Sequence, residues 1–382
     1  MKLKLILGGA LGTLCYLANP ALAQIKIGVA QALTGNAAQY GVPIRKGLEL
    51  AVGEINGAGG INGKKIELVV EDEQGRKVEA LNVFRKLIFQ DKVLLLFGPT
   101  LSNSAQASDH VAQAAKVVVF GTSNTADGIT SIGDYVFRNS VTEADILPVT
   151  LKVAVKKTGL KKVAVFYGND DIFTKSGYDH FAKALQALKI AVTTTETFAK
   201  GDVDFRAQLT KIKASNADAI VLSALVAEGG PIMVQARQLG VALPFIGGNG
   251  MNSPRLFELA QDHSDDLWIG SPWSVENPAE ENKRFISAFQ TAHHEAPDQF
   301  AAQAYDAMYI VAQALKKIKL TGSVEADRRA LRDGLPAIQW SGATGPFKFR
   351  QVKDKRGQPA GYDAVQSAIV MRTQGNRYMI LK

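Results

Sequence analysis

Hydrophobic and polar residues change their period in a regular order along the chain. Residues 25–30 alternate as in a strand, and apolar side chains at helical spacing follow from Ile44 to Ile55, with Pro43 in the first helical turn. The run 93–97 is apolar throughout, which is typical of a strand covered on both faces. The same order continues with strands at 66–70 and 117–120 and helices at 78–88 and 104–115. Such alternation predicts a parallel sheet flanked by helices.

The pattern restarts after residues 137–140. The second block has strands at 163–167, 191–198, 219–222 and 245–246 and helices near 176–188, 205–212, 231–239 and 254–260. A helix-rich segment at 279–335 and short strand-like pieces at 368–381 follow. The chain is therefore predicted to be an α/β protein with two blocks of parallel sheet.

The composition is that of a globular protein. Of 382 residues, 46% are hydrophobic and 21% charged, which permits a large core. Lys and Arg number 44 against 36 Asp and Glu, a net charge of +8. The basic residues are spread along the chain without interleaved aromatics, so nucleic-acid binding is disfavoured. A single cysteine excludes a disulfide framework and a zinc site of several thiolates within one chain.

The first 23 residues have the pattern of a cleavable signal peptide. Lys2 and Lys4 precede an apolar stretch, and residues 21–23 (Ala-Leu-Ala) supply the small side chains for cleavage before Gln24. A membrane anchor is the alternative, but the apolar run is short for a span and Asn-Pro at 19–20 interrupts it. Removing this segment leaves 42 basic against 36 acidic residues, or +6, and removes the cysteine. We therefore expect a secreted protein.

Side chains with catalytic or metal-binding chemistry are sparse. His110 and His180 fall inside predicted helices, and His-His at 293–294 has no partner at helical spacing, so a zinc site is disfavoured. The sequence contains neither a G-x-S-x-G motif nor a phosphate-binding P-loop. Asp170 and Asp171 could be paired catalytic acids, although a solvated turn or a loop facing a hinge is the favoured interpretation. We predict no catalytic residue, no metal site and no cofactor.

Two loops that follow predicted strands carry several hydroxyl side chains. Residues 98–104 follow the strand at 93–97, and residues 121–125 follow the strand at 117–120. Open parallel sheets bind ligands beyond the carboxyl ends of their strands. Free N–H groups at helix N-termini and Ser or Thr hydroxyls are donors at the same place. Helix capping alone could explain either loop, but together they predict a cradle for a carboxylate.

Several short motifs follow the signal peptide in order: Ile-Gly-Val at 27–29, Leu-Thr-Gly at 33–35, Gln-Tyr-Gly at 39–41, Glu-Ile-Asn at 54–56, Gly-Gly-Ile-Asn-Gly at 59–63, Gly-Pro at 98–99, Asn-Asp-Asp at 169–171, Asp-Phe at 204–205 and Gly-Ala-Thr-Gly-Pro-Phe-Lys-Phe at 342–349. This set covers essentially the whole mature chain. It resembles the periplasmic solute-binding proteins of ATP-driven importers for branched-chain amino acids.

The resemblance implies a periplasmic protein of two doubly wound parallel-sheet lobes that enclose the ligand (a periplasmic binding protein-like I fold). Three crossovers near Ser140, Ser271 and Arg350 would join the lobes. The N-terminal lobe would then contain residues 24–140 and 271–350, and the C-terminal lobe residues 141–270 and 351–382.

The family's binding positions, carried over by motif, imply ligand contacts from both lobes. Ser102 corresponds to the serine of the first ligand-binding loop, and Ser123 and Thr125 to the backbone and hydroxyl contacts of the next. Tyr40 corresponds to the aromatic residue of the first lobe, and Phe173 to that of the second.

Two departures from the family affect the expected ammonium end of the ligand. Amino-acid binders place an acid after the strand at 245–246, where this chain has Gly-Asn-Gly with Asn249 at its centre. They often place a tyrosine after the strand at 219–222, where this chain has Ala-Leu-Val with Leu225 at its centre. Glu228 is nearby and could supply the missing negative charge.

We therefore expect a non-enzymatic, monomeric protein that binds a small carboxylate, an amino acid, and delivers it to the permease and ATPase subunits of an ABC importer. An organic acid without an ammonium group, aliphatic or aromatic, is the rival ligand, because Leu225, Val226 and Phe173 make this region apolar. A ligand-sensing domain for a receptor is a second alternative. A hydrolase on a similar scaffold is a third, disfavoured because no nucleophile–base pair is evident.

Overall fold

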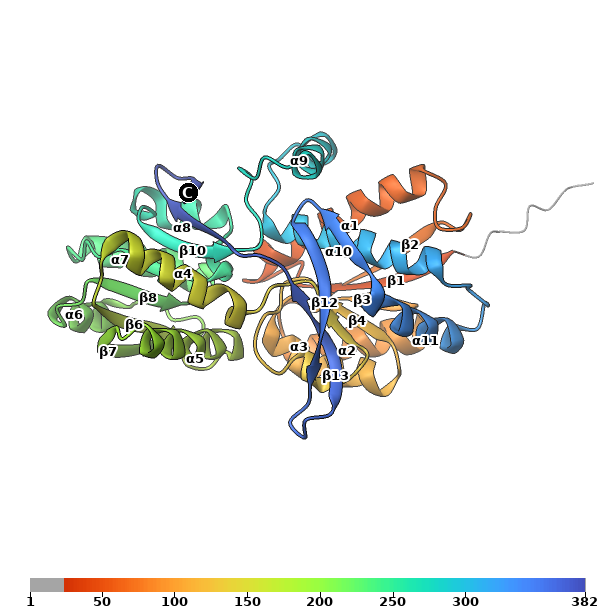
Figure 1. Ribbon diagram of the computed structural model, residues 1–382, viewed down its shortest axis with the longest axis horizontal. Coiled ribbons are helices and arrows are strands. Elements are labelled where there is room, and N and C mark those ends of the chain that lie inside the picture. Colours follow the sequence, from red (N-terminus) through yellow and green to blue (C-terminus); the bar gives the residue numbers. More distant parts are fainter. Residues whose placement is uncertain (1–23, 382) are drawn as a thin grey trace, which may run out of the picture.

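The computed structural model describes residues 24–381, which form two lobes lying side by side, each a sheet between helices (Figure 1). The signal peptide predicted for residues 1–23 lies outside the described residues. Two helix-flanked sheets of mainly parallel strands confirm the predicted α/β fold with two doubly wound lobes. Among residues 24–381, no helix has the length and apolar character that crossing a membrane requires.

The N-terminal lobe has an eight-stranded sheet. Its strands lie in the order β11 (Gln339–Gly342), β12 (Gly345–Lys353), β13 (Pro359–Val365), β5 (Val136–Arg138), β4 (Val118–Gly121), β3 (Leu95–Phe97), β1 (Ile25–Gln31) and β2 (Ile66–Asp72). The helices of this lobe are α1 (Ala38–Gly57), α2 (Lys77–Arg85) with a π-helical continuation at Lys86–Gln90, α3 (Ser102–Ala114), α9 (Glu280–His293), α10 (Gln299–Lys317) and α11 (Val324–Gly334). Short 3-10 helices lie at Thr130–Ile132 and Leu335–Ala337.

The C-terminal lobe has a seven-stranded sheet. Its strands lie in the order β15 (Tyr378–Ile380), β14 (Ile369–Thr373), β10 (Leu267–Ser271), β9 (Phe245–Gly247), β8 (Ala219–Ser223), β6 (Lys162–Gly168) and β7 (Ala191–Phe198). Its helices are α4 (Glu143–Thr158), α5 (Ile172–Ala187), α6 (Arg206–Ala214), α7 (Val226–Gln238) and α8 (Arg255–Ala260). Short 3-10 helices lie at Asn249–Met251 and Gln261–His263. Within this described sheet, β14 pairs antiparallel with both β10 and β15, and all other pairs are parallel.

Successive residues of β3 enter two different cores, which explains its unbroken apolar run. Leu95 and Phe97 belong to the core that includes α1 and α10. Leu96 belongs to the core between the sheet, α2 and α3. All three side chains are fully buried, so both faces of the strand require apolar residues. The sheet thus places the end of β3 between two layers of helices.

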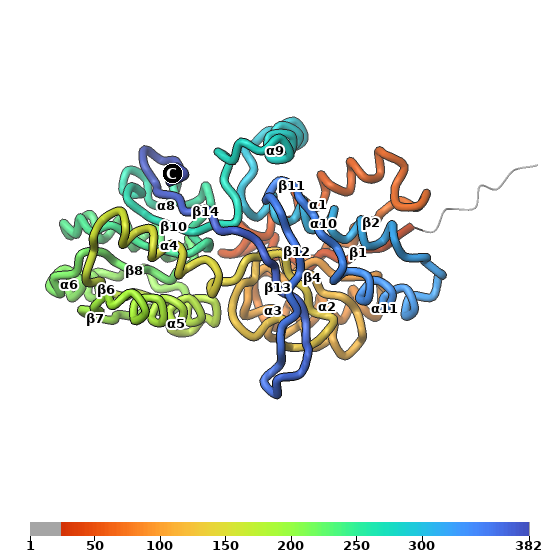
Figure 2. The backbone as a smooth tube through the Cα atoms, in the orientation of Figure 1, coloured from red at the N-terminus to blue at the C-terminus, as the bar shows by residue number. Residues whose placement is uncertain are grey.

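The chain passes between the lobes after β5, after β10 and after β13 (Figure 2). The predicted third crossover near Arg350 is wrong, because β12 and β13 form a hairpin whose second strand pairs with β5. Residues 351–365 therefore belong to the sheet of the N-terminal lobe. The rings of Phe349 and Tyr362 pack on Phe137 of β5, which holds the hairpin against this sheet.

Several helices begin earlier than their hydrophobic pattern predicted. α3 begins at Ser102, α5 at Ile172 and α7 at Val226, where the patterns indicated starts at 104, 176 and 231. α1 begins at Ala38, so Pro43 lies inside the helix rather than in its first turn. The first turns of α3, α5 and α7 follow strands that end between the lobes, where core-facing periodicity is not required.

Candidate functional site

A small cavity lies between the lobes, at the ends of β3 and β4 on one side and of β6, β8 and β9 on the other. The N-terminal lobe contributes Tyr40, Thr100, Leu101, Ser102, Ser123 and Phe300. The C-terminal lobe contributes Asp171, Phe173, Leu225, Asn249 and Gly250. Most of the predicted ligand residues are in these two sets, but Thr125 and Glu228 are not. The cavity volume is about 30 Å³, so an amino acid can enter only if the walls separate.

The N-terminus of α3 forms one wall of the cavity. Leu101 at its N-cap position carries no polar group, and no side chain caps the helix. The N–H groups of the first helical turn therefore have no capping acceptor. The positive end of the helix dipole lies at the same end of α3, beside the cavity. The Ser102 hydroxyl oxygen accepts a hydrogen bond from Ala126 N at 3.3 Å, which leaves its proton for another acceptor. This wall suits a carboxylate.

The turn that leads into this wall requires glycine. Gly98 has a φ of +127°, and a Cβ at this position would lie 2.0 Å from the carbonyl oxygen of Ala30. Any other residue would therefore displace the loop between β3 and α3.

Hydrogen bonds fasten the loops after β3 and β4 to each other. The Ser123 hydroxyl donates to Thr100 O at 2.7 Å. The Thr100 hydroxyl donates to Gln31 Oε1 at 2.7 Å and accepts from Ala32 N at 2.9 Å. Both hydroxyl protons are thus used within the protein, so Ser123 and Thr100 shape the cavity rather than offer it a free proton.

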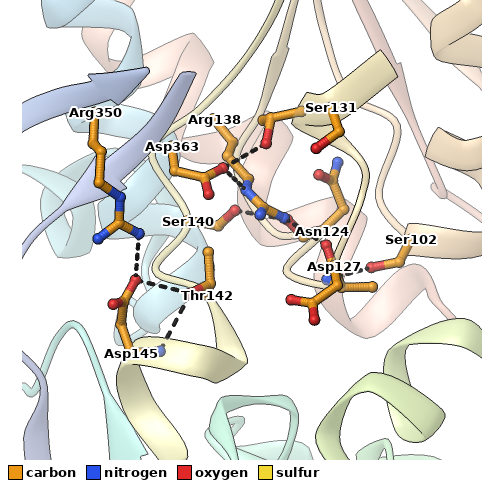
Figure 3. A network of polar contacts seen from close by, with 12 residues as sticks. Ser102, Asn124, Asp127, Ser131, Arg138, Ser140, Thr142, Asp145, Arg350 and Asp363 are labelled. Atoms are coloured by element: carbon orange, nitrogen blue, oxygen red, sulfur yellow. Dashed lines mark hydrogen bonds and ion pairs between the residues drawn. The ribbon is translucent and has the colours of Figure 1, made fainter. Parts of the chain in front are cut away.

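Arg138 holds the loop after β4 from the side of the crossovers (Figure 3). Its guanidinium donates to Ala126 O at 2.9 Å and to Asn124 O at 3.3 Å, and its Nε pairs with Asp363 at 2.7 Å. Arg138 is only 2% exposed, so its positive charge must be balanced inside the protein, and the Asp363 carboxylate does this. Arg138 precedes the first crossover and Asp363 the third, so the ion pair links both crossovers to the cavity wall.

Thr125, predicted to contact the ligand, lies outside the cavity lining. Its hydroxyl donates to Glu143 Oε1 at 3.3 Å, across the boundary between the lobes. Glu143 is 1% exposed at the start of α4, and burial raises the pKa of its carboxyl to about 7. The sequence pattern could not reveal this partner, because Glu143 follows the first crossover rather than a strand end of the same sheet.

Tyr40 connects the two lobes across the cavity. Its hydroxyl donates to Gly250 O at 2.8 Å and accepts from Val226 N at 2.9 Å. Its ring packs edge-on against Phe300, with centroids 4.8 Å apart. Burial raises the pKa of Tyr40, so the phenol remains protonated and can donate. Phe300 comes from a helix rather than a strand end, which is why the strand-end search missed it.

The C-terminal lobe supplies apolar walls and one amide. Phe173 and Leu225, at the starts of α5 and α7, line the cavity together with the buried Asn249. The loop after Asn249 is held by Tyr378, whose hydroxyl contacts Met251 O at 2.5 Å. The loop that presents Asn249 therefore depends on β15.

Glu228, predicted to replace the missing acid, faces a different pocket. That pocket shares Asp171 and Leu225 with the cavity and also contains Lys200. Glu228 Oε1 accepts a hydrogen bond from Gly201 N at 3.3 Å. Burial raises the pKa of its carboxyl. Glu228 thus lies behind the cavity wall rather than in it.

Asp171 is the one acid in the cavity lining. Of the two interpretations of residues 170–171, a solvated turn does not describe the buried Asp171, which lies in a loop that faces the other lobe. The residue is 4% exposed and caps α5, with Oδ1 accepting from Phe173 N at 2.8 Å and Thr174 N at 3.2 Å. An Asp directly before an apolar helical pattern is a typical N-cap signal, which could have placed this side chain.

The two lobes, their crossovers and the cavity define a ligand-binding protein that closes around a small molecule. Within residues 24–381, no group of three or more His, Cys, Asp or Glu side chains is arranged to hold a metal ion.

Comparisons with known proteins agree with this class. Residues 24–371 match the family model described as "Periplasmic binding protein". The leucine-, isoleucine-, valine-, threonine- and alanine-binding protein of Pseudomonas aeruginosa is 28% identical over 340 residues, covering 89% of this chain and 88% of that protein. The chain therefore belongs to the periplasmic binding protein family.

Solved structures have the same fold. The branched-chain amino acid transporter substrate-binding protein LivJ from Streptococcus pneumoniae, in complex with isoleucine, is 31% identical with a TM-score of 0.84, covering 94% of this chain and all of that one. A solute-binding protein from R. palustris in complex with benzoate is 24% identical with a TM-score of 0.82, covering 94% of this chain and 96% of that one.

Proposed function

We propose that this chain captures a small ligand with a carboxylate group, namely an amino acid, between its lobes in the periplasm. It then delivers the ligand to the permease and ATPase subunits of an ABC importer. The observation that carries the proposal is the uncapped N-terminus of α3, with the free proton of Ser102 beside it, in a cavity closed by the second lobe. Such a wall binds a carboxylate through main-chain N–H groups and one hydroxyl. The relatives whose names include amino acids support this ligand class.

The cavity supports binding rather than catalysis. Its lining contains no histidine or lysine that could act as a base toward Ser102 or Ser123, and its one carboxylate, Asp171, caps α5 and accepts from the Asn103 amide. The Ser123 proton is already donated to a main-chain carbonyl. The protein therefore releases its ligand unchanged, and it works as a monomer because the two lobes of one chain complete the site.

An organic acid without an amino group is the second candidate ligand. Phe173, Phe300 and Leu225 give the cavity apolar walls. Asn249 stands where the family resemblance implies an acid in amino-acid binders. The R. palustris protein in complex with benzoate has the same fold.

A thermal-shift screen of the mature protein separates the candidates. L-leucine, L-alanine and L-phenylalanine are compared with 4-methylpentanoate, propanoate, 3-phenylpropanoate and benzoate. A ligand that binds only the native state raises the melting temperature by mass action. Shifts with amino acids support the proposal, shifts only with amino-free acids favour the second candidate, and no shift with any of these carboxylates contradicts the proposed site.

The transport role is tested in cells that lack the protein. Uptake of the ligand identified by the screen should fall when the gene is deleted and return with the intact gene. Unchanged uptake, with loss of a response to the ligand, would instead indicate a sensor that reports to a receptor.

A further inference from the structure

Asp171 carries the one charge among the residues that line the cavity. The other polar groups of the lining are hydroxyls, main-chain groups and the Asn249 amide. A carboxylate in this position is costly unless it is hydrogen-bonded and its charge is balanced, because burial removes its hydration.

The protein satisfies part of this requirement but does not neutralise the charge. Asp171 Oδ1 accepts two main-chain N–H bonds at the start of α5, and Oδ2 accepts from the Asn103 amide. Asp171 makes no ion pair in the part of the chain that the structure describes. The positive charge that acts on its carboxyl is that of Lys200, whose side chain is exposed. Burial raises the pKa of Asp171, as expected for a carboxyl without a cationic partner.

The acid lies close to the wall that suits a carboxylate. Asn103, the second residue of α3, donates to Asp171 Oδ2 at 2.5 Å and accepts from Ile172 N at 3.1 Å. The N-terminus of α3 and the carboxyl of Asp171 are thus one side chain apart. An α-amino acid carries its ammonium and carboxylate on the same carbon atom, which matches this separation of complementary charges. An acid without an amino group would place its carboxylate near Asp171 with nothing to offset the repulsion.

We propose that Asp171 receives the ammonium group of a ligand whose carboxylate lies at the N-terminus of α3, so that the site selects α-amino acids over acids that lack an amino group. This inference rests on the proposed function and assigns the ammonium end to Asp171 rather than to Glu228, which faces the neighbouring pocket.

The test compares Asp171→Asn with the matched variant Asp170→Asn by titration calorimetry. Asparagine keeps an oxygen that can cap α5, so the fold is retained while the charge is removed. Asp170 is the exposed neighbour, and its substitution changes the net charge equally. The probes are L-leucine, L-alanine and L-phenylalanine, each paired with 4-methylpentanoate, propanoate or 3-phenylpropanoate.

We expect Asp171→Asn to weaken binding of the amino acid by about 10- to 100-fold, the usual effect of losing a hydrogen bond to a charged group. Binding of the paired amino-free acid should stay the same or tighten, and Asp170→Asn should bind both like the wild type. Equal losses for both members of a pair, or no loss for the amino acid, would overturn the role of Asp171.

The wild-type protein provides a second measurement that does not depend on a variant. If circular dichroism shows that Asp171→Asn does not fold, the ratio of the two affinities in the wild type decides, and an amino-free acid that binds as tightly as its amino acid overturns the inference. Failure of the wild type to bind any of these probes would instead contradict the proposed function, and the inference with it.

Discussion

The hydroxyl groups near the cavity have different roles, which their hydrogen bonds distinguish. The Ser102 oxygen accepts from a main-chain N–H, so its proton is available to a ligand. The Ser123 proton is donated to Thr100 O, and the Thr125 proton to Glu143. Among these residues, Ser102 is the one expected to contact a carboxylate through its side-chain proton.

Replacing Ser102 by alanine should weaken ligand binding by roughly 1.5–3 kcal/mol, the usual value for a hydrogen bond to a charged group. Without ligand, the free energy of unfolding should fall by about 1 kcal/mol, because the variant leaves the buried Ala126 N–H without its acceptor. Ser108→Ala is the matched control, since Ser108 bonds only within α3, to Ser104 O at 3.0 Å. If both variants bind alike, the Ser102 hydroxyl makes no contact with the ligand.

Glu143 should make the stability of the protein depend on pH. Burial raises the pKa of its carboxyl in the native state to about 7, from an ordinary value of 4.5. Between pH 4.5 and pH 7 the native state therefore holds a proton that the unfolded state has lost. Stability therefore falls as the pH rises from 4.5 to 7, by about 3 kcal/mol for this group. Glu143→Gln removes this pH-dependent loss of stability, and its amide oxygen can still accept the hydrogen bond from the Thr125 hydroxyl.

Chemical unfolding without ligand at a series of pH values tests this expectation. The variant should match the wild type near pH 4 and exceed its stability above pH 7. Glu281→Gln, at an exposed position of α9, should show no such trend. A difference between Glu143→Gln and wild type that does not vary with pH would show that Glu143 titrates normally in the folded protein.

At the scale of elements, the sequence predicted most strands and helices of the two blocks. It did not predict α4, β10 or the β12–β13 hairpin, nor where the functional helices begin. The apolar runs of the central strands are unmistakable, because two helical layers bury both faces, as Leu95 and Leu96 illustrate. The starts of α3, α5 and α7 lie beside the cavity instead, which Ser102, Phe173 and Leu225 line. Phe300 was missed because it belongs to α10 rather than to a strand end, and Asp171 because its N-cap position before α5 was not recognised.

The ion pair between Arg138 and Asp363 should stabilise the loop after β4. Arg138→Met leaves Asp363 without its partner, and breaking a buried pair of this kind costs about 3–5 kcal/mol. The loop also loses the hydrogen bonds to Asn124 O and Ala126 O, so ligand affinity should fall as well. Denaturant unfolding and calorimetry of the variant measure both effects.

The double variant Arg138→Met with Asp363→Leu separates the two contributions. It removes the unpaired charge, so much of the stability should return while the affinity stays low. Recovery of both quantities together would mean that the main-chain bonds from Arg138 do not position the cavity wall.

At the scale of the whole molecule, the described arrangement is closed. Hydrogen bonds join the lobes from Tyr40 to Gly250 and Val226, and from Asn103 to Asp171. A further pair links Asp127 to His180 of α5 at 2.9 Å. The lobes can therefore separate only when these contacts break.

Tyr40→Phe should shift the protein without ligand toward an open arrangement. The variant loses the bonds to both Gly250 and Val226, each worth about 1 kcal/mol. Small-angle scattering should give a larger radius of gyration than for the wild type, and saturating ligand should compact both proteins. Tyr167→Phe, whose ring stacks on Tyr178 within the C-terminal lobe, should behave like the wild type. Identical radii in all states would show that Tyr40 does not hold the lobes together.

The position of β14 and β15 in the chain determines when the site can be completed during synthesis. These strands belong to the C-terminal lobe but follow the β12–β13 hairpin of the other lobe in sequence, and β14 pairs with β10. A chain made from its N-terminus therefore carries an unpaired edge at β10 until residues 369–373 emerge. Because Tyr378 fixes the loop that presents Asn249, ligand capture begins only after both lobes have nearly finished folding.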